Sequence, residues 1–231
     1  MRIDVFTLFP RWFDWFVEQR SVRNAVDGGL EFKPIDLRET TPLRAGQVDD
    51  TPYGGGAGMV VRVDVVEAAL RERYHEDAVA VRSSRRVIAL SAGGRPFDDA
   101  LAGELADGLA GGREVVLLCG RYEGFDERVN EHLASDVVSI GPYVLAGGEL
   151  AAMVVSDAVI RKIPGALGHE ESALEESFSP ALGGAPEYPH YTRPVEWRGH
   201  RVPDVLLSGN HGEIDAWRRA RSAERGRSAQ P

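Results

Sequence analysis

The chain has 231 residues, of which 43% are hydrophobic and 27% charged, a composition typical of one or two folded domains. Its longest apolar run, Leu150–Val155, is far shorter than the roughly 20 residues that a membrane-spanning helix needs. The start of the chain carries Asp4 and lacks the apolar segment of a signal peptide, so we expect a cytoplasmic protein without membrane contact. Cys119, the single cysteine, excludes an internal disulfide, and its apolar neighbours favour a buried structural thiol over a reactive one.

The net charge of −9 argues against a nucleic-acid partner, but the charge is distributed unevenly. Residues 190–231 contain eight arginines and five acidic residues, a net charge of +3, so residues 1–189 carry −12. An arginine-rich segment on an acidic body can bind phosphate through a local patch. A solvated helix face is the alternative interpretation. Only two of the 27 basic residues are lysine, so a general bias toward arginine would also produce this pattern.

Short runs rich in β-branched residues predict the strands. Several of these runs are apolar throughout, which suits strands buried on both faces of a parallel sheet with helical crossovers. In chain order the expected strands are Ile3–Phe9, Leu30–Leu37, Val87–Leu90, Val115–Cys119 and Val137–Ile140. The sequence therefore predicts an α/β fold around a parallel sheet.

Helices are expected between and after these strands. Pro10 can open a helix as its first residue, and Trp12, Phe13 and Phe16 would form the core face of that helix. The helix before Pro164 is apolar on nearly all sides, so it should be buried, and the proline would end it. The later expected helices are Val63–Tyr74, Pro96–Leu109, Asp126–Leu133, Leu150–Ile163 and Glu213–Arg225.

The composition changes after Pro164. Residues 165–193 show no sustained hydrophobic period, which is typical of a long mobile connection, and such connections are usually functional or disordered. A short extended piece is expected at Pro203–Gly209. We therefore predict a first domain at residues 1–163, a flexible linker at 164–190 and a small helical domain at 191–231.

Three of the apolar runs end in glycine-containing loops, after Leu90, after Cys119 and after Ile140. Ligands of open α/β sheets bind outside the carboxyl ends of the strands, and glycine lets the backbone approach a ligand closely. We expect one small-molecule pocket there, built mostly from main chain. The sequence has no Walker pattern, no G-x-G-x-x-G helix opening, no histidine spacing for a metal and no G-x-S-x-G elbow. These absences disfavour nucleotide-triphosphate, dinucleotide, zinc and serine-hydrolase chemistry.

Six motifs follow one another along nearly the whole chain, from Arg2 to about Arg221. They are Asp49–Met59, Leu118–Val129, Ser139–Glu149, Ile163–His169, Tyr191–Pro194 and Val205–His211. Each motif alone is modestly specific, whereas six motifs in this order, separated by nearly the distances found in one known family, are highly specific. Together they resemble the TrmD family of bacterial tRNA (guanine-N1)-methyltransferases.

This resemblance implies a SPOUT-type α/β domain with a C-terminal trefoil knot, a small helical carboxyl domain, and an obligate homodimer with the active site at the subunit interface. It also implies methylation of N1 of the guanosine just 3′ of the anticodon in tRNA, with S-adenosyl-L-methionine (AdoMet) as cofactor, and it leaves a Mg²⁺ requirement open. Nothing in the hydrophobic periodicity indicates a knot, and knots are rare in proteins, so that expectation rests on the resemblance alone.

Guanine N1 carries a proton at neutral pH, so a general base must free its lone pair while a cation stabilises charge on O6. The resemblance implies Glu176 as the base and Arg161 as the cation. The family has Asp at the position of Glu176. The pKa values of the two acids differ by only ~0.4 unit, but a displacement of one ångström can cost about a hundredfold in rate. Adjacent Glu175 offers a second carboxylate; by themselves both residues are typical of a solvated acidic loop.

Cofactor contacts are implied for the loops after three of the strands. The matching positions are Leu90, Ser91, Gly120, Tyr122, Glu123, Ile140, Gly141, Pro142, Tyr143, Val144, Leu145, Gly147 and Gly148. The family usually has Asp in place of Pro142 and Pro in place of Ala92. Since proline lacks a main-chain donor and fixes φ, contacts near Tyr143 could be altered. An alternative role for Glu123 is an N-terminal helix cap.

Substrate contacts are implied for residues outside these loops. Asp49 and Tyr53 match positions associated with the target guanine and its neighbourhood. The candidates for tRNA contacts are His190, Tyr191, Arg193, Asn210 and His211, and buried polar or turn roles are the alternatives for each. The departures at Glu176, Pro142 and Ala92 leave two rival functions open: a diverged paralogue that methylates another RNA or a small heteroaromatic, and a catalytically silent RNA-binding protein.

Overall fold

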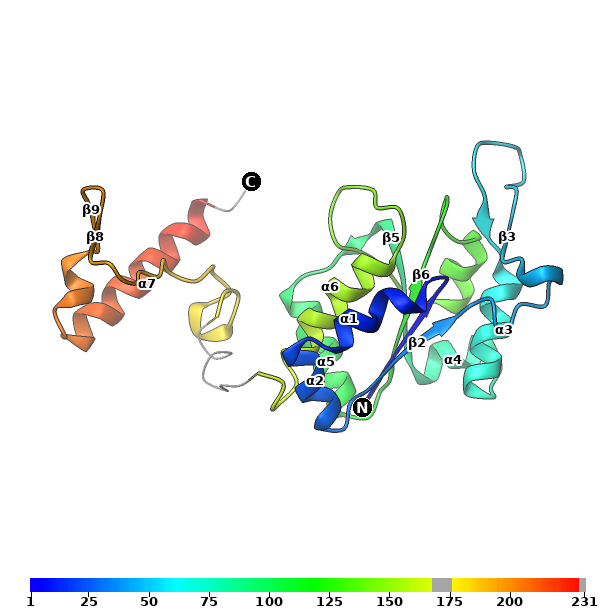
Figure 1. The fold of residues 1–231 in the computed structure, drawn as a ribbon, viewed down its shortest axis with the longest axis horizontal. Helices are drawn as coiled ribbons and strands as arrows, with labels where there is room; N and C mark the ends of the chain where they lie inside the picture. The colour runs from blue at the N-terminus through cyan, green and yellow to red at the C-terminus, as the bar shows by residue number, and fades with distance from the viewer. Residues whose placement is uncertain (168–175, 229–231) are drawn as a thin grey trace. The chain divides into compact units, whose positions relative to one another are not determined.

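The computed structural model describes residues 1–167 and 176–228 (Figure 1). The chain divides into two compact units, Met1–Gly168 and His169–Pro231. None of the helices in the described ranges combines the length and the apolar character needed to cross a membrane.

A five-stranded parallel sheet lies at the centre of the first unit, as predicted. Its strands are β1 (Arg2–Thr7), β2 (Glu31–Asp36), β5 (Arg86–Pro96), β6 (Val115–Cys119) and β7 (Asp136–Ser139). Their order across the sheet is β2-β1-β6-β5-β7. In register, Val115 of β6 pairs with Ile3 on one side and with Arg86 on the other. Beside the sheet, β3 (Asp49–Asp50) and β4 (Val60–Val61) form a short antiparallel hairpin.

Helices cover both faces of the sheet and bury two separate cores. One core contains residues of α1 (Asp14–Val17), α2 (Arg20–Asp27), α5 (Asp99–Ala110) and α6 (Glu149–Ile160). The other contains residues of α3 (Val63–Tyr74), α4 (Ala78–Ser84) and the π-helical turn η3 (Val129–Leu133). Successive residues of β6 enter the two cores alternately, because side chains of a strand point to opposite faces. Both faces are buried, which is why this strand is apolar throughout.

The other elements are short 3-10 turns, a second hairpin and one long helix. The 3-10 turns are η1 (Pro10–Phe13), η2 (Arg44–Gly46), η5 (Pro180–Leu182) and η6 (Asp204–Leu207). The second unit also contains a hairpin of β8 (Glu196–Trp197) and β9 (His200–Arg201), followed by α7 (His211–Ser228).

Several details of the two units differ from the sequence expectation. Phe13 and Phe16 are buried as predicted, but Trp12 is 43% exposed and does not belong to the core. Helix α6 is not buried on all sides, because Leu150 and Val154 are each 48% exposed. The expected extended piece at Pro203–Gly209 is the 3-10 turn η6, and helix α4 was not predicted. In α4 the alternating Ala-Val-Ala-Val segment carries no helical period, and the helix is started by the Asp77 side chain, which accepts a hydrogen bond from the Val79 N–H (3.0 Å).

Candidate cofactor pocket and active site

A cavity of about 270 Å³ opens beside the carboxyl ends of β6 and β7, where the pairing of β5 with β7 is interrupted after Leu90. It is lined by residues 90–92 in the middle of β5, by the end of β7, and by the loops that follow β6 and β7. Every predicted cofactor position lines the cavity except Pro142, and Ala92 lines it as well. A cavity therefore lies where the pocket was predicted, while the binding of a small molecule and the role of each residue in it stay predictions.

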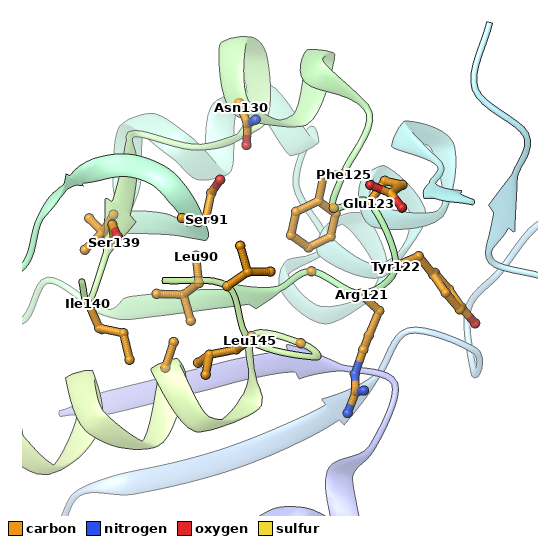
Figure 2. Close-up of a pocket in the computed structure, with 18 of the residues that line it drawn as sticks. Leu90, Ser91, Arg121, Tyr122, Glu123, Phe125, Asn130, Ser139, Ile140 and Leu145 are labelled. Atoms are coloured by element: carbon orange, nitrogen blue, oxygen red, sulfur yellow. The ribbon is translucent and has the colours of Figure 1, made fainter. Parts of the chain in front are cut away.

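Apolar and polar side chains share the lining of the cavity. Figure 2 shows Leu90 and Leu145 between Ile140 on one side of the lining residues and Glu123 on the other. Such a surface offers apolar contact to a flat ring and a carboxylate to a cationic group.

Two consecutive glycines bring the chain back from β7 against the end of β6. A Cβ atom on Gly148 would lie 2.7 Å from the Cα atom of Cys119, closer than side chains and backbone can approach. The Gly148 N–H donates to the Gly120 carbonyl (2.9 Å), and Gly147 forms a bridge with Arg121. Only glycine permits this contact of backbone with backbone, and helix α6 begins directly after it.

A buried ionic network stabilises the loop that contains Gly147 and Gly148. The Glu149 carboxylate is fully buried and accepts hydrogen bonds from the Thr7 hydroxyl (2.8 Å) and from the Arg121 Nε (3.1 Å). The Nη1 atom of Arg121 also donates to the Ala146 carbonyl (3.1 Å). Removing one partner of a buried ion pair costs about 3–5 kcal/mol, because the other charge is left without compensation. The network therefore ties β1, the loop after β6 and the start of α6 into one rigid wall.

Two aromatic rings cover the guanidinium of Arg121. Its Cζ atom lies 4.2 Å from the centroid of the Phe9 ring and 4.9 Å from that of Trp12. This cation–π contact explains why Trp12 stands outside the core. Sequence reasoning missed both Arg121 and Glu149 as site residues, although two charged residues inside otherwise glycine-walled loops were a usable signal.

The loop after β6 is attached to the β3–β4 hairpin. The Glu123 N–H donates to the Met59 carbonyl (3.0 Å), and the Val61 N–H donates to the Gly124 carbonyl (2.9 Å). Tyr122, directly before Glu123, has a φ of 59°, a left-handed conformation that costs roughly 1–2 kcal/mol for a residue with a side chain. The next helical residues begin at Glu127, four residues further along, so Glu123 is not their N-cap.

The hairpin carries two of the predicted substrate residues. Asp49 pairs with Val61 in the β3–β4 ladder, and Tyr53 in the connecting loop is fully exposed. Neither residue lines the cavity, but the hydrogen bonds that the Met59 carbonyl accepts and the Val61 N–H donates place their hairpin beside the cavity wall.

The two predicted catalytic residues belong to different units. Arg161 is the exposed C-cap of α6, and its N–H donates to the Asp157 carbonyl (3.1 Å). Glu176 is half-buried in the second unit, where its carbonyl accepts a hydrogen bond from the Ser179 N–H (3.1 Å). Glu175 lies outside the described residues. The joint action of Glu176 and Arg161 stays a prediction.

The remaining predicted tRNA-side residues are exposed in the second unit. His190 forms an ion-pair contact with Glu187 (2.9 Å), and Arg193 is exposed. Asn210 lies at the start of α7, where its side chain accepts from the Glu213 N–H (3.4 Å). A helix-capping role thus accounts for Asn210 without any RNA contact.

Metal binding finds no support in the described ranges. Within residues 1–167 and 176–228, no group of three or more His, Cys, Asp or Glu side chains is arranged to hold a metal ion.

The fold and the cavity together define a class of protein: a doubly wound α/β protein with a cavity at the carboxyl edge of its parallel sheet, the place where such folds bind their ligands. Within this class the chain belongs to the family described as tRNA (Guanine-1)-methyltransferase TrmD, whose sequence profile matches residues 1–231.

Relatives named as tRNA methyltransferases resemble the chain over most of their length. A tRNA (guanine-N(1)-)-methyltransferase of Brevibacillus brevis is 46% identical over 100% of this chain and 90% of the relative. The protein of the same name from Geobacter metallireducens is 48% identical over 97% of this chain and 87% of the relative. That from Staphylococcus carnosus is 44% identical over 94% and 84%.

Proposed function

We propose that the protein is an AdoMet-dependent methyltransferase that modifies N1 of the guanosine 3′ of the anticodon in tRNA. Membership of the TrmD family along the whole chain supports the reaction, as do the names of the relatives. The observation that carries the proposal is the cavity beside the carboxyl ends of β6 and β7 and the middle of β5, which is lined by all but one of the positions expected to hold the cofactor.

The residues of the cavity suit AdoMet chemically. Leu90, Ile140 and Leu145 would contact the flat adenine ring, and the Glu123 carboxylate carries the charge opposite to that of the sulfonium and ammonium groups. The main chain from Gly120 to Gly124 and from Ile140 to Gly148 would supply further hydrogen bonds.

When bound, AdoMet supplies an electrophilic methyl group, which becomes bonded to guanine N1 as its bond to sulfur breaks and the electron pair stays on sulfur. Glu176 would accept the N1 proton, so that the lone pair of N1 is free to attack. Arg161 would offset the negative charge that develops on O6. A cation is also favourable at its position, because Arg161 follows the last turn of α6, where the helix dipole is negative.

We further propose a SPOUT-type knot, a homodimer and a tRNA-binding function for residues 191–231. The return of the chain from β7 to the end of β6 at Gly148 supports a knotted topology. The exposed apolar residues Leu150 and Val154 on one face of α6 support a subunit interface beside the pocket. The arginine excess of residues 190–231 supports contact with the phosphates of tRNA.

The decisive experiment measures transfer of labelled methyl groups to unmodified tRNA that has guanosine after the anticodon. Glu176→Gln should reduce turnover to background, because the amide cannot accept the N1 proton, while calorimetry should find AdoMet affinity unchanged. Glu176→Asp is the matched control, because it keeps the carboxylate and should retain measurable activity.

Two results would overturn the proposal in distinguishable ways. Full activity of Glu176→Gln would refute the assignment of Glu176 as the base but not the methyltransferase activity. If the parent protein binds AdoMet but gives no product on this tRNA, the proposed substrate is wrong. If it binds no AdoMet, the proposed enzymatic activity is wrong.

A further inference from the structure

One face of α7 is packed against the segment that follows Glu176. Four residues of α7 make this contact: Arg218, Ser222, Arg225 and Gly226. Their spacing, i, i+4, i+7 and i+8, is that of a single stripe along a helix. The contacted segment is residues 185–188, in the same compact unit as α7.

The contacts combine hydrogen bonds and packing. The Ser222 hydroxyl, which is buried, donates to the Pro186 carbonyl (2.8 Å), and the Arg225 Nη1 donates to the Glu187 carbonyl (2.9 Å). A Cβ atom on Gly226 would already lie 3.4 Å from the Cβ of Ala185, so the backbones approach closely there. The four residues of α7 thus contact the main chain of residues 185–187 as well as the side chains of this segment.

The guanidinium of Arg218 adds a contact at the end of the segment. Its Cζ atom lies 4.9 Å from the centroid of the Tyr188 ring, and Tyr188 is buried. Two of the arginine side chains of α7, those of Arg218 and Arg225, therefore contact this segment.

Residues 185–187 are in turn hydrogen-bonded to the residues next to Glu176. The Phe178 N–H donates to the Ala185 carbonyl (2.9 Å), and the Glu187 N–H donates to the Ser177 hydroxyl oxygen (2.9 Å). The Glu176 carbonyl accepts from the Ser179 N–H (3.1 Å). Residues 176–187 thus form a closed loop that starts at Glu176 and rests on α7.

We propose that α7 is the positioning element for Glu176, and that Ser222 and Arg225 fix the base through the closed loop without touching the substrate. This inference rests on the proposed function, since it takes Glu176 as the base. A carboxylate on a loosely held loop samples many positions, whereas proton abstraction needs the acceptor within hydrogen-bond distance of N1. The contacts of α7 reduce that sampling.

The test uses the full-length protein with Ser222→Ala and Arg225→Met combined, which removes both hydrogen bonds to the loop. With saturating AdoMet and tRNA, kcat should fall about tenfold or more, while the KM for tRNA and the Kd for AdoMet stay within about twofold of the parent. Restoring a donor in Ser222→Ala with Arg225→Lys should recover part of kcat. Arg219→Met is the matched control for the loss of charge, because Arg219 is an exposed residue of α7 whose Nε, among the described residues, donates to the Asp215 carbonyl of the same helix.

Hydrogen exchange followed by mass spectrometry gives a readout independent of activity. In the combined variant, the peptide containing Phe178 and Glu187 should exchange faster than in the parent, and the strands of the first unit should be unchanged. If the combined variant loses the fold of the second unit, Gly226→Leu serves instead, since leucine favours the helix but its side chain would displace Ala185.

A parental kcat in these variants, or a loss confined to the KM for tRNA, would overturn the inference. Unchanged exchange of residues 177–187 would do the same. If Glu176→Gln is inactive while the α7 variants are fully active, the positioning role fails and the proposed base stands. If Glu176→Gln is fully active, the proposed base fails, whatever the α7 variants do.

Discussion

Cys119 is the last residue of β6, and its side chain is fully buried directly under the wall of the cavity. Burial raises the pKa of its thiol well above the ordinary value, because the thiolate would lose its hydration, and the carboxylate of Glu149 adds to the shift. Because the pKa is raised in the folded state, the fold requires the protonated thiol. Its contribution to stability is fully present below the ordinary thiol pKa of ~8.5 and is lost as the pH rises from there toward the folded-state pKa. The buried thiol expected from the sequence is confirmed.

Alkylation should therefore separate the folded from the unfolded protein. At pH 8 in native buffer, iodoacetamide should modify Cys119 at least about a hundredfold more slowly than in concentrated urea, because the native thiol is both covered and protonated. Intact-mass spectrometry over time measures both rates. Comparable rates in the two conditions would show that the end of β6 opens readily and that the wall is not rigid.

At the scale of elements, the junction of β6, the glycine loop and α6 decides the geometry of the pocket. The loop contacts the end of β6 through the backbone of Gly148, and the buried carboxylate of Glu149 then anchors the first turn of α6 to Arg121 and Thr7. A strand end, a loop and a helix start are thus held by three contacts within a few residues. Small changes there should affect stability and cofactor binding together.

Gly148→Ala tests this junction. A Cβ atom 2.7 Å from the Cα of Cys119 cannot be accommodated without moving the backbone, so the free energy of unfolding should fall by about 1–3 kcal/mol and AdoMet affinity should fall with it. Urea unfolding and calorimetry measure the two quantities.

Gly103→Ala in α5 is the matched control. A Cβ there meets no atom within 4 Å, and removing a glycine from a helix should stabilise the protein by roughly 0.5–1 kcal/mol. Equal stability of Gly148→Ala and the parent would mean that the loop tolerates displacement.

At the scale of the whole molecule, the open question concerns a second copy of the chain. Leu150 and Val154 lie one turn apart on α6 and are each 48% exposed, although the rest of this helix is largely buried. Apolar side chains exposed in a row on a core helix are typical of an interface. Because α6 starts at the pocket wall, an interface there would place the partner subunit beside the cofactor.

Sedimentation velocity should find the parent protein as a dimer and Leu150→Glu with Val154→Glu as a monomer, because the charges would have to be buried. Methyl transfer should be lost with the dimer if the active site lies at the interface. The control is Val79→Glu, which places the same charge on a 55% exposed residue of α4, on the opposite side of the sheet. A monomeric parent, or a double variant that remains dimeric, would contradict the proposed interface.

Local patterns were sufficient for most elements. Helix α3 and strand β6 have the bounds predicted for them, Val63–Tyr74 and Val115–Cys119, because helical period and uninterrupted apolar character are properties of neighbouring residues. The turn η6 was misassigned, since an apolar run as short as Val205–Leu207 fits an extended segment as well as a turn. Trp12 was placed in the core because its helix face is apolar, whereas its position is decided by Arg121, more than a hundred residues away in the sequence.

The sequence by itself determined the five strands of the parallel sheet, most helices and the glycine loops after β6 and β7, because these depend on local periodicity and on chain flexibility at single positions. Only the tertiary structure decided the strand order, the contact of Gly148 with Cys119, the burial of Glu149 beneath Arg121, and the seating of residues 185–188 on α7. These features join residues far apart in the chain, and the free energy that selects them comes from long-range packing and ion pairing, which leave no periodic signal in the sequence.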